Sequence, residues 1–77
     1  MSTQRKRFEV GTVIRLLNKL DFYGASMGHQ CEVGDLYVVY QLEDTSSYSI
    51  TRIIHMSGYK IWVPTFELVE KCEADGL

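Results

Sequence analysis

The stretch Tyr48–Val63 reads YSITRIIHMSGYKIWV, and it decides the fold. Apolar residues recur at every second position in its two halves, which is the pattern of half-buried β-strands. Only Ser57 and Gly58 separate the halves, and glycine readily adopts the positive φ that a tight hairpin turn needs. The stretch therefore predicts an antiparallel hairpin with strands at Ser49–Met56 and Lys60–Val63.

The two faces of this hairpin differ in character. In the first half, one face carries Arg52 together with four apolar residues, Tyr48, Ile50, Ile54 and Met56. We expect Arg52 to lie near an end of the fold, or to extend its charge into solvent from an apolar stem. In the second half, Trp62 alternates with Ile61 and Val63, so we expect Trp62 on the outer face.

Two further strands are predicted upstream of the hairpin. Leu36–Leu42 alternates in the same way. The segment Val10–Leu20 is ambiguous, because its apolar residues also fit helical spacing and Thr12 could cap a helix. Its run of β-branched residues favours a strand at Val13–Leu16, and a helix over residues 12–20 stays as the alternative. We expect residues 18–35 to form a long irregular loop, the first place to look for a binding surface.

Downstream, Pro64 lacks a backbone donor and is expected to end the preceding strand. Residues 65–67 then have room for a single helical turn before a last strand at Leu68–Val69. The chain is thus expected to be all-β, with five short antiparallel strands closed into a small barrel that hides their edges. We expect a disordered basic tail over residues 1–7, the barrel over 8–71 and a flexible tail over 72–77.

Size and charge restrict the function. A chain of 77 residues builds one small core and has little backbone to spare for a catalytic cleft, so an enzyme is not expected. Residues 1–9 carry a net charge of +2 and residues 10–77 a net charge of −4. No apolar run approaches the roughly 18 residues of a membrane span. We therefore expect a cytoplasmic protein with no membrane association.

The residues that could bind metal or carry out nucleophilic chemistry do not form a recognisable pattern. Cys31 and Cys72 are far apart in sequence and are expected to be reduced thiols, since a bridge would need their Cα atoms within about 7 Å. Together with His29 and His55, they lack the spacing of a structural metal site. We expect His29 in the loop and His55 facing outward, with no metal, no cofactor and no catalytic residues.

Three stretches carry a resemblance to a known family: Phe8–Leu16, Val33–Val39 and Trp62–Val69. They are similar to the opening strand, the start of the second strand and the closing proline, short turn and strand of Src-homology-3-type small β-barrels. The resemblance covers residues 8–71 and implies a five-stranded Src-homology-3-like barrel with a long first loop and a single helical turn before the last strand. The chain looks most like a small phage or bacterial accessory protein.

The resemblance also implies a place for a ligand. Peptide-binding members of this group hold a polyproline helix in a groove of aromatic residues and a proline. The matching positions here are Tyr23, Trp62, Pro64 and Phe66. The sequence Leu16-Leu17-Asn18 stands where the family has paired tyrosines, so a different partner is expected to use the surface.

We expect a non-enzymatic binding module for a protein partner. The residues expected to contact that partner are Tyr23, Tyr37, Lys60, Trp62, Pro64 and Phe66. The alternative is a nucleic-acid-binding barrel that uses Arg5, Lys6, Arg7 and Arg52 with the exposed aromatics, although the acidic body would repel phosphates. Another reading of the aromatic residues is packing in the core or at its rim, which we expect for Tyr40, Tyr48, Tyr59 and Phe66.

Overall fold

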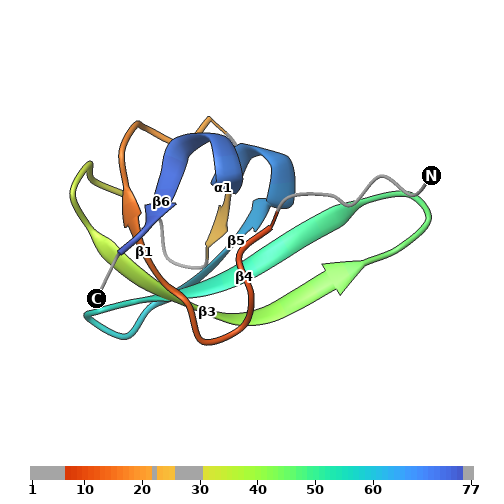
Figure 1. The fold of residues 1–77 in the computed structure, drawn as a ribbon, viewed down its shortest axis with the longest axis horizontal. Helices are drawn as coiled ribbons and strands as arrows, with labels where there is room; N and C mark the ends of the chain where they lie inside the picture. The colour runs from red at the N-terminus through yellow and green to blue at the C-terminus, as the bar shows by residue number, and fades with distance from the viewer. Residues whose placement is uncertain (1–6, 22, 26–30, 76–77) are drawn as a thin grey trace.

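The computed structural model describes residues 7–21, 23–25 and 31–75 (Figure 1). These residues form one antiparallel sheet and a short helix, which confirms the expected all-β class. The elements are β1 Val13–Leu16, β2 Gly24–Ala25, β3 Leu36–Asp44, β4 Ser49–His55, β5 Lys60–Pro64, α1 Thr65–Lys71 and β6 Cys72–Ala74. The strand order across the sheet is β2-β5-β4-β3-β1-β6.

The hairpin of β4 and β5 forms as the alternation predicts. The backbone N–H of His55 donates to the carbonyl oxygen of Tyr59 at 2.8 Å, and that of Gly58 donates to the carbonyl oxygen of His55 at 2.8 Å. Gly58 has a φ of 108°, a value that a residue with a side chain rarely adopts. The expected role of Gly58 in the turn is confirmed.

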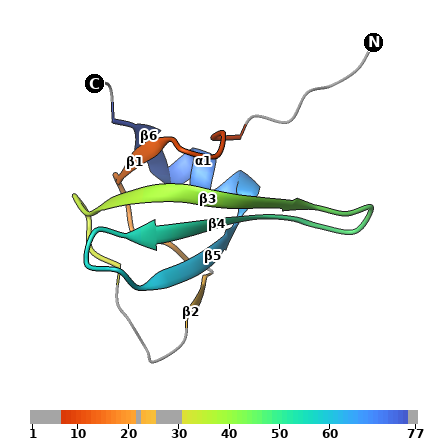
Figure 2. The same cartoon turned by 90° about the horizontal axis from the view of Figure 1, so that it is seen from below.

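The hairpin of β3 and β4 is longer and extends beyond the rest of the sheet (Figure 2). Its register shifts between Val39 and Gln41: Val39 pairs with Ile53, whereas Gln41 pairs with Arg52. The residue between them forms a β-bulge, which reverses the alternation of the strand. Side chains of β3 that face the core therefore change from odd to even positions along the strand.

The inner face of β4 differs from the one suggested by its apolar residues. Thr51 and Ile53 are fully buried, and Arg52 lies on the opposite face with Ile50 and Ile54. Arg52 is therefore not a charge in an otherwise apolar core face. Thr51 can be buried without an unpaired polar group, because its hydroxyl lies 3.0 Å from the hydroxyl of Thr65 and the two form a hydrogen bond.

The C-terminal part of the sequence prediction is wrong. Leu68–Val69 is not a strand; it lies in α1, which occupies seven residues instead of a single turn. Glu67, Leu68, Glu70 and Lys71 are good helix formers, and a two-residue apolar pair has no readable period. The last strand is β6, in residues expected to be a flexible tail, and it pairs with β1.

The closed barrel is not confirmed. The outermost strands β2 and β6 lie at opposite ends of the strand order, and no pairing joins them among the described residues. β2 also lies inside the loop expected to be irregular. The core is made of the fully buried Ile14, Leu16, Tyr37, Val39, Ile53, Val63 and Leu68. In the described part of the chain, no helix is long and apolar enough to cross a membrane.

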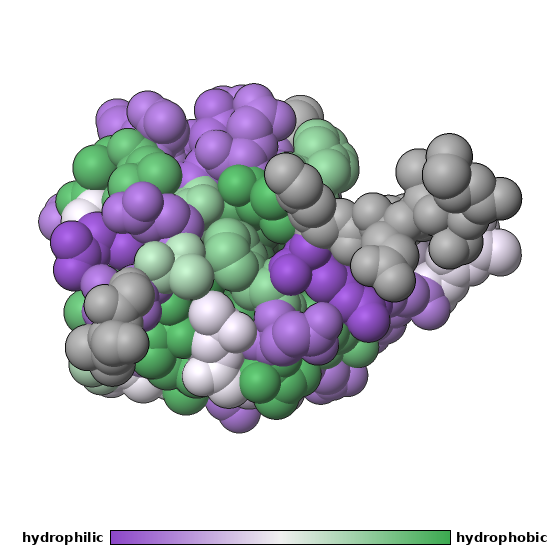
Figure 3. All heavy atoms as spheres, in the orientation of Figure 1, coloured by the Kyte–Doolittle hydropathy of each residue, from purple (hydrophilic) through white to green (hydrophobic). Residues whose placement is uncertain are grey.

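The surface of this fold is mixed in character. Figure 3 shows apolar side chains in the middle of the visible face and at its left and lower edges, with hydrophilic side chains between and above them. Several large apolar residues are exposed among the described residues, the most exposed being Phe66 at 70% and Met56 at 66%. Single exposed apolar residues are ordinary, so only those that gather around a hollow point to a site.

Candidate functional site

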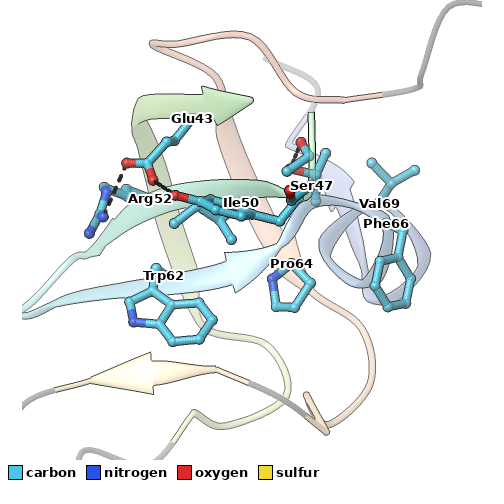
Figure 4. Close-up of a pocket in the computed structure, with 11 residues that line it drawn as sticks. Glu43, Ser47, Ile50, Arg52, Trp62, Pro64, Phe66 and Val69 are labelled. Carbon is cyan, nitrogen blue, oxygen red and sulfur yellow. Dashed lines mark hydrogen bonds and ion pairs between the residues drawn. The ribbon is translucent and has the colours of Figure 1, made fainter. Parts of the chain in front are cut away.

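An open pocket of about 980 Å³ lies where the β3–β4 hairpin meets β5 and α1. Both strands of the hairpin contribute to one wall, and β5 and α1 form the other (Figure 4). Its lining residues are Glu43, Ser47, Tyr48, Ser49, Ile50, Arg52, Trp62, Pro64, Thr65, Phe66 and Val69. We call it the hairpin pocket.

The apolar wall of the hairpin pocket is a row of three residues. Trp62 and Pro64 occupy alternate positions of β5 and point to the same side, opposite the buried Ile61 and Val63. Phe66, in the first turn of α1, continues the row (Figure 4). The side chain of Trp62 is 41% exposed and that of Phe66 is 70% exposed. The outer position that the sequence predicted for Trp62 is confirmed.

Gly24 sets the position of the indole ring. It lies directly opposite Trp62 in the pairing of β2 with β5. A Cβ atom on residue 24 would lie 1.9 Å from Nε1 of Trp62 and 2.0 Å from its Cε2, far inside van der Waals contact. The indole therefore lies across the glycine, and any side chain at position 24 would displace it.

A charged cluster borders the opposite wall. The hydroxyl of Tyr48 donates to Oε2 of Glu43 at 2.7 Å, and Nη2 of Arg52 donates to Oε1 of the same carboxylate at 3.3 Å. These two contacts lower the pKa of Glu43, the tyrosine hydrogen bond being the stronger cause. The same hydrogen bond raises the pKa of Tyr48. At neutral pH the cluster is thus a carboxylate held between a phenol and a guanidinium.

The wall between helix and sheet is held together by hydroxyl groups. Thr65, the first residue of α1, is buried, and its Oγ1 accepts a hydrogen bond from the hydroxyl of Ser49 at 2.7 Å. Together with the contact to Thr51, this bond fixes the start of α1 against β4. Because Phe66 follows Thr65 directly, the same contacts set where Phe66 projects.

Three of the six residues expected to contact a partner come together: Trp62, Pro64 and Phe66. Lys60 lies outside the hairpin pocket, with its Nζ 5.2 Å from the centre of the Tyr40 ring. Tyr23 is half-buried and packs against the core.

Tyr37 is not at the surface, because its side chain is fully buried. It lies before the bulge, on the core face of β3 with Val39, so the alternation alone could not tell which face was inner. Tyr48 and Phe66, expected in the core or at its rim, are instead 48% and 70% exposed.

The residues expected to contact nucleic acid do not form a basic patch in the described part of the chain. Arg5 and Lys6 lie outside the described residues. Arg7 forms ion pairs with Asp44 and, at 3.8 Å, with Glu9. Arg52 pairs with Glu43. Each described arginine of this set therefore faces a carboxylate.

The sequence missed the wall formed by the β3–β4 hairpin. Glu43, Ile50 and Val69 were not selected as site residues, although all three line the hairpin pocket. One signal for this wall was present in the sequence: the apolar Ile50 and the charged Arg52 stand at alternate positions and therefore share a face of the strand. That face was attributed to the core because four of its five residues are apolar.

A second polar cluster surrounds His55. Its Nε2 lies 3.0 Å from Oδ2 of Asp35, its Nδ1 accepts the backbone N–H of Ser57 at 3.0 Å, and its ring stacks on Tyr59 with centroids 4.4 Å apart. His55 is half-buried and shares the inner face with Tyr37, so the expected outward position is wrong. These contacts hold the β4–β5 turn against the start of β3.

The cysteines are free thiols, and burial raises the pKa of both, to about 12 for Cys72. His29 lies outside the described residues. Among residues 7–21, 23–25 and 31–75, no three potential metal ligands come together.

Comparisons with protein-family models, with curated proteins and with solved structures find no match to this chain. Any functional conclusion therefore depends on the geometry of the sites themselves.

Proposed function

We propose that this chain is a non-enzymatic binding module and that its hairpin pocket holds a segment of a protein partner. The observation that carries the proposal is the row of Trp62, Pro64 and Phe66, which lines an open pocket of about 980 Å³. Large, rigid aromatic side chains that stay partly exposed in the free protein are typical anchors of protein interfaces. The aliphatic residues Ile50 and Val69 add apolar contact area beside the row.

The composition of the pocket favours a protein segment over a nucleic acid. Among the described residues, its lining contains one cation, Arg52, so a polyanion would find a single charged contact there. Residues 10–77 carry a net charge of −4, which repels a phosphate backbone. Nucleic-acid binding through Arg5, Lys6, Arg7 and Arg52 therefore remains the second candidate, and it is tested by nuclease treatment below.

Affinity capture from the native cell lysate tests the proposal, with three baits used side by side: the unaltered chain, Trp62→Ala and Met56→Ala. Met56 is a matched control, because it is 66% exposed and apolar but lies in the β4–β5 turn outside the pocket. We expect a protein that the unaltered chain and Met56→Ala retain, that Trp62→Ala loses, and that nuclease treatment does not release. Capture that depends on nucleic acid, or that all three baits share, would contradict the proposal.

We further propose that the fold is an open variant of the Src-homology-3-like barrel and that the protein is a small cytoplasmic phage or bacterial accessory protein. Support for the fold comes from the order of the strands, in which the last strand β6 returns to pair with β1. It also comes from Pro64, after which the chain turns into α1. An experimental structure of the whole chain tests this proposal through the course of residues 26–30 and the contacts of β2.

A further inference from the structure

We propose that the segment bound in the hairpin pocket is acidic: it places an Asp or Glu carboxylate on Arg52 and apolar side chains along the row of Trp62, Pro64 and Phe66. This inference rests on the proposed function and names the chemistry of the partner. It follows from which hydrogen-bonding groups of the pocket are already used and which are free.

The carboxylate of the pocket has both oxygens engaged. Oε2 of Glu43 accepts the Tyr48 hydroxyl at 2.7 Å, and Oε1 faces Nη2 of Arg52 at 3.3 Å. A basic ligand would have to share these oxygens with the two donors that already occupy them. Arg52 has more unused capacity, because a guanidinium has five N–H donors and, among the described residues, its one hydrogen bond goes to Glu43. Most of the unused hydrogen-bonding capacity of this charged pair therefore belongs to the cation.

Arg52 is also accessible and correctly placed. Its side chain is 32% exposed, and it pairs directly across β4 and β5 with Trp62, on the outer face of the sheet. Directly opposed residues in an antiparallel sheet have their Cβ atoms about 5 Å apart. A carboxylate on Arg52 would thus lie beside the indole, with Pro64 and Phe66 continuing the row away from it. An extended segment with an acidic residue followed by apolar residues fits this order.

The overall negative charge of the chain does not oppose a single carboxylate. Charges separated by more than about 8–10 Å in physiological salt are largely screened, whereas a direct bidentate contact between a guanidinium and a carboxylate is not. For a polyanion such as a nucleic acid, repulsion outweighs the single attractive contact, because most of its phosphates would lie over acidic or apolar surface. The inference therefore concerns a peptide with few acidic residues rather than a polyphosphate.

The experiment begins with selection of short random peptides displayed on phage against the unaltered chain, with counter-selection against Trp62→Ala. We expect the selected peptides to carry Asp or Glu next to apolar residues. The best peptide is then synthesised in its acidic form and in the matching amide form, Asn for Asp or Gln for Glu. Trp62 is the only tryptophan of the chain, so its fluorescence reports occupation of the pocket directly. We expect the amide form to bind at least about tenfold more weakly.

Three variants of the chain separate a specific contact from a general charge effect. Arg52→Gln should lower the affinity for the acidic peptide about tenfold. Lys60→Gln removes the same charge from the outer face but lies outside the pocket, and it should leave the affinity within about twofold because the charge is exposed. Glu43→Gln should raise the affinity for the acidic peptide, since the guanidinium then loses its competing carboxylate. For a basic ligand, the same variant would lower the affinity.

Two results overturn the inference while leaving the proposed function intact: Trp62-dependent peptides without acidic residues, or an acidic peptide that binds Arg52→Gln as tightly as the unaltered chain. A selection that yields no Trp62-dependent peptide contradicts both. A single-stranded oligonucleotide that changes Trp62 fluorescence and is lost in Arg52→Gln would assign the anionic ligand to nucleic acid and overturn the inference as well.

Discussion

Ile61 and Trp62 are neighbours on β5, yet they should respond very differently to truncation. Ile61 is 2% exposed and lies in the core, whereas Trp62 is 41% exposed and lines the hairpin pocket. Ile61→Ala would leave a closed cavity, a change that costs about 2–5 kcal/mol in protein cores. We expect ~4 kcal/mol for Ile61→Ala, because almost none of the side chain reaches water.

The expected cost of Trp62→Ala follows from its partial exposure. About three-fifths of the side chain leaves water on folding. For a side chain that buries up to about 250 Å², this burial stabilises the fold by at most ~4 kcal/mol at about 25 cal/mol per Å². Compact unfolded chains and the remaining Cβ reduce the value, and the open pocket leaves no closed cavity. We expect ~2 kcal/mol, or about 10 °C in melting temperature for a chain of this size.

Urea denaturation followed by far-ultraviolet circular dichroism measures both values, because Trp62→Ala removes the only tryptophan and with it the fluorescence signal. A chain of 77 residues is stable by about 4–12 kcal/mol in all, so both variants can be measured if Ile61→Ala still folds. Should that variant not fold, Ile61→Val is expected to cost ~1 kcal/mol and serves as the core reference. A Trp62→Ala variant as destabilised as Ile61→Ala would refute the outer placement of the indole.

Three other predictions follow from single contacts. Gly24→Ala puts a Cβ into the space of the Trp62 indole, which must then move away from β2 toward solvent. The fluorescence emission of Trp62 should therefore shift to the red, and an unchanged spectrum would contradict the packing of the two residues. Burial raises the pKa of Tyr37, so above about pH 10 only the unfolded chain loses the phenolic proton. The contribution of Tyr37 to the free energy of unfolding should therefore be fully present below about pH 10 and decrease above it. Urea midpoints measured against pH should show this decline, and Tyr37→Phe should make it less steep. Cys72 is 5% exposed, and burial raises its pKa to about 12. At about pH 8 it should therefore react with a thiol reagent more slowly than the less buried Cys31. Mass spectrometry of the native chain measures both rates, and equal rates would refute the burial of Cys72.

Local patterns in the sequence determined the central part of the fold. The alternation of Lys60–Val63 predicted both the strand and the outward position of Trp62, because residues on one strand take opposite faces without reference to any other part of the chain. Gly58 predicted the turn for a similar reason, since its positive φ is a property of the residue itself. These features need no knowledge of neighbouring strands.

Tertiary contacts decided the pocket and the ends of the chain. The bulge in β3 changes which residues face the core, and it is defined by the pairing with β4, so the sequence placed Tyr37 outside. The face of Arg52 was placed inside because Ile50 and Ile54 share it, and only the packing of β4 shows that Thr51 and Ile53 face the core. The helix at Thr65–Lys71 is held by its buried Thr65 and Leu68, and β6 is a strand because it pairs with β1, which lies more than fifty residues earlier. The hairpin pocket joins residues 43 to 69 from two strands of a hairpin, a third strand and a helix. Such a site depends on distances through space, which the order of residues along a chain does not encode locally.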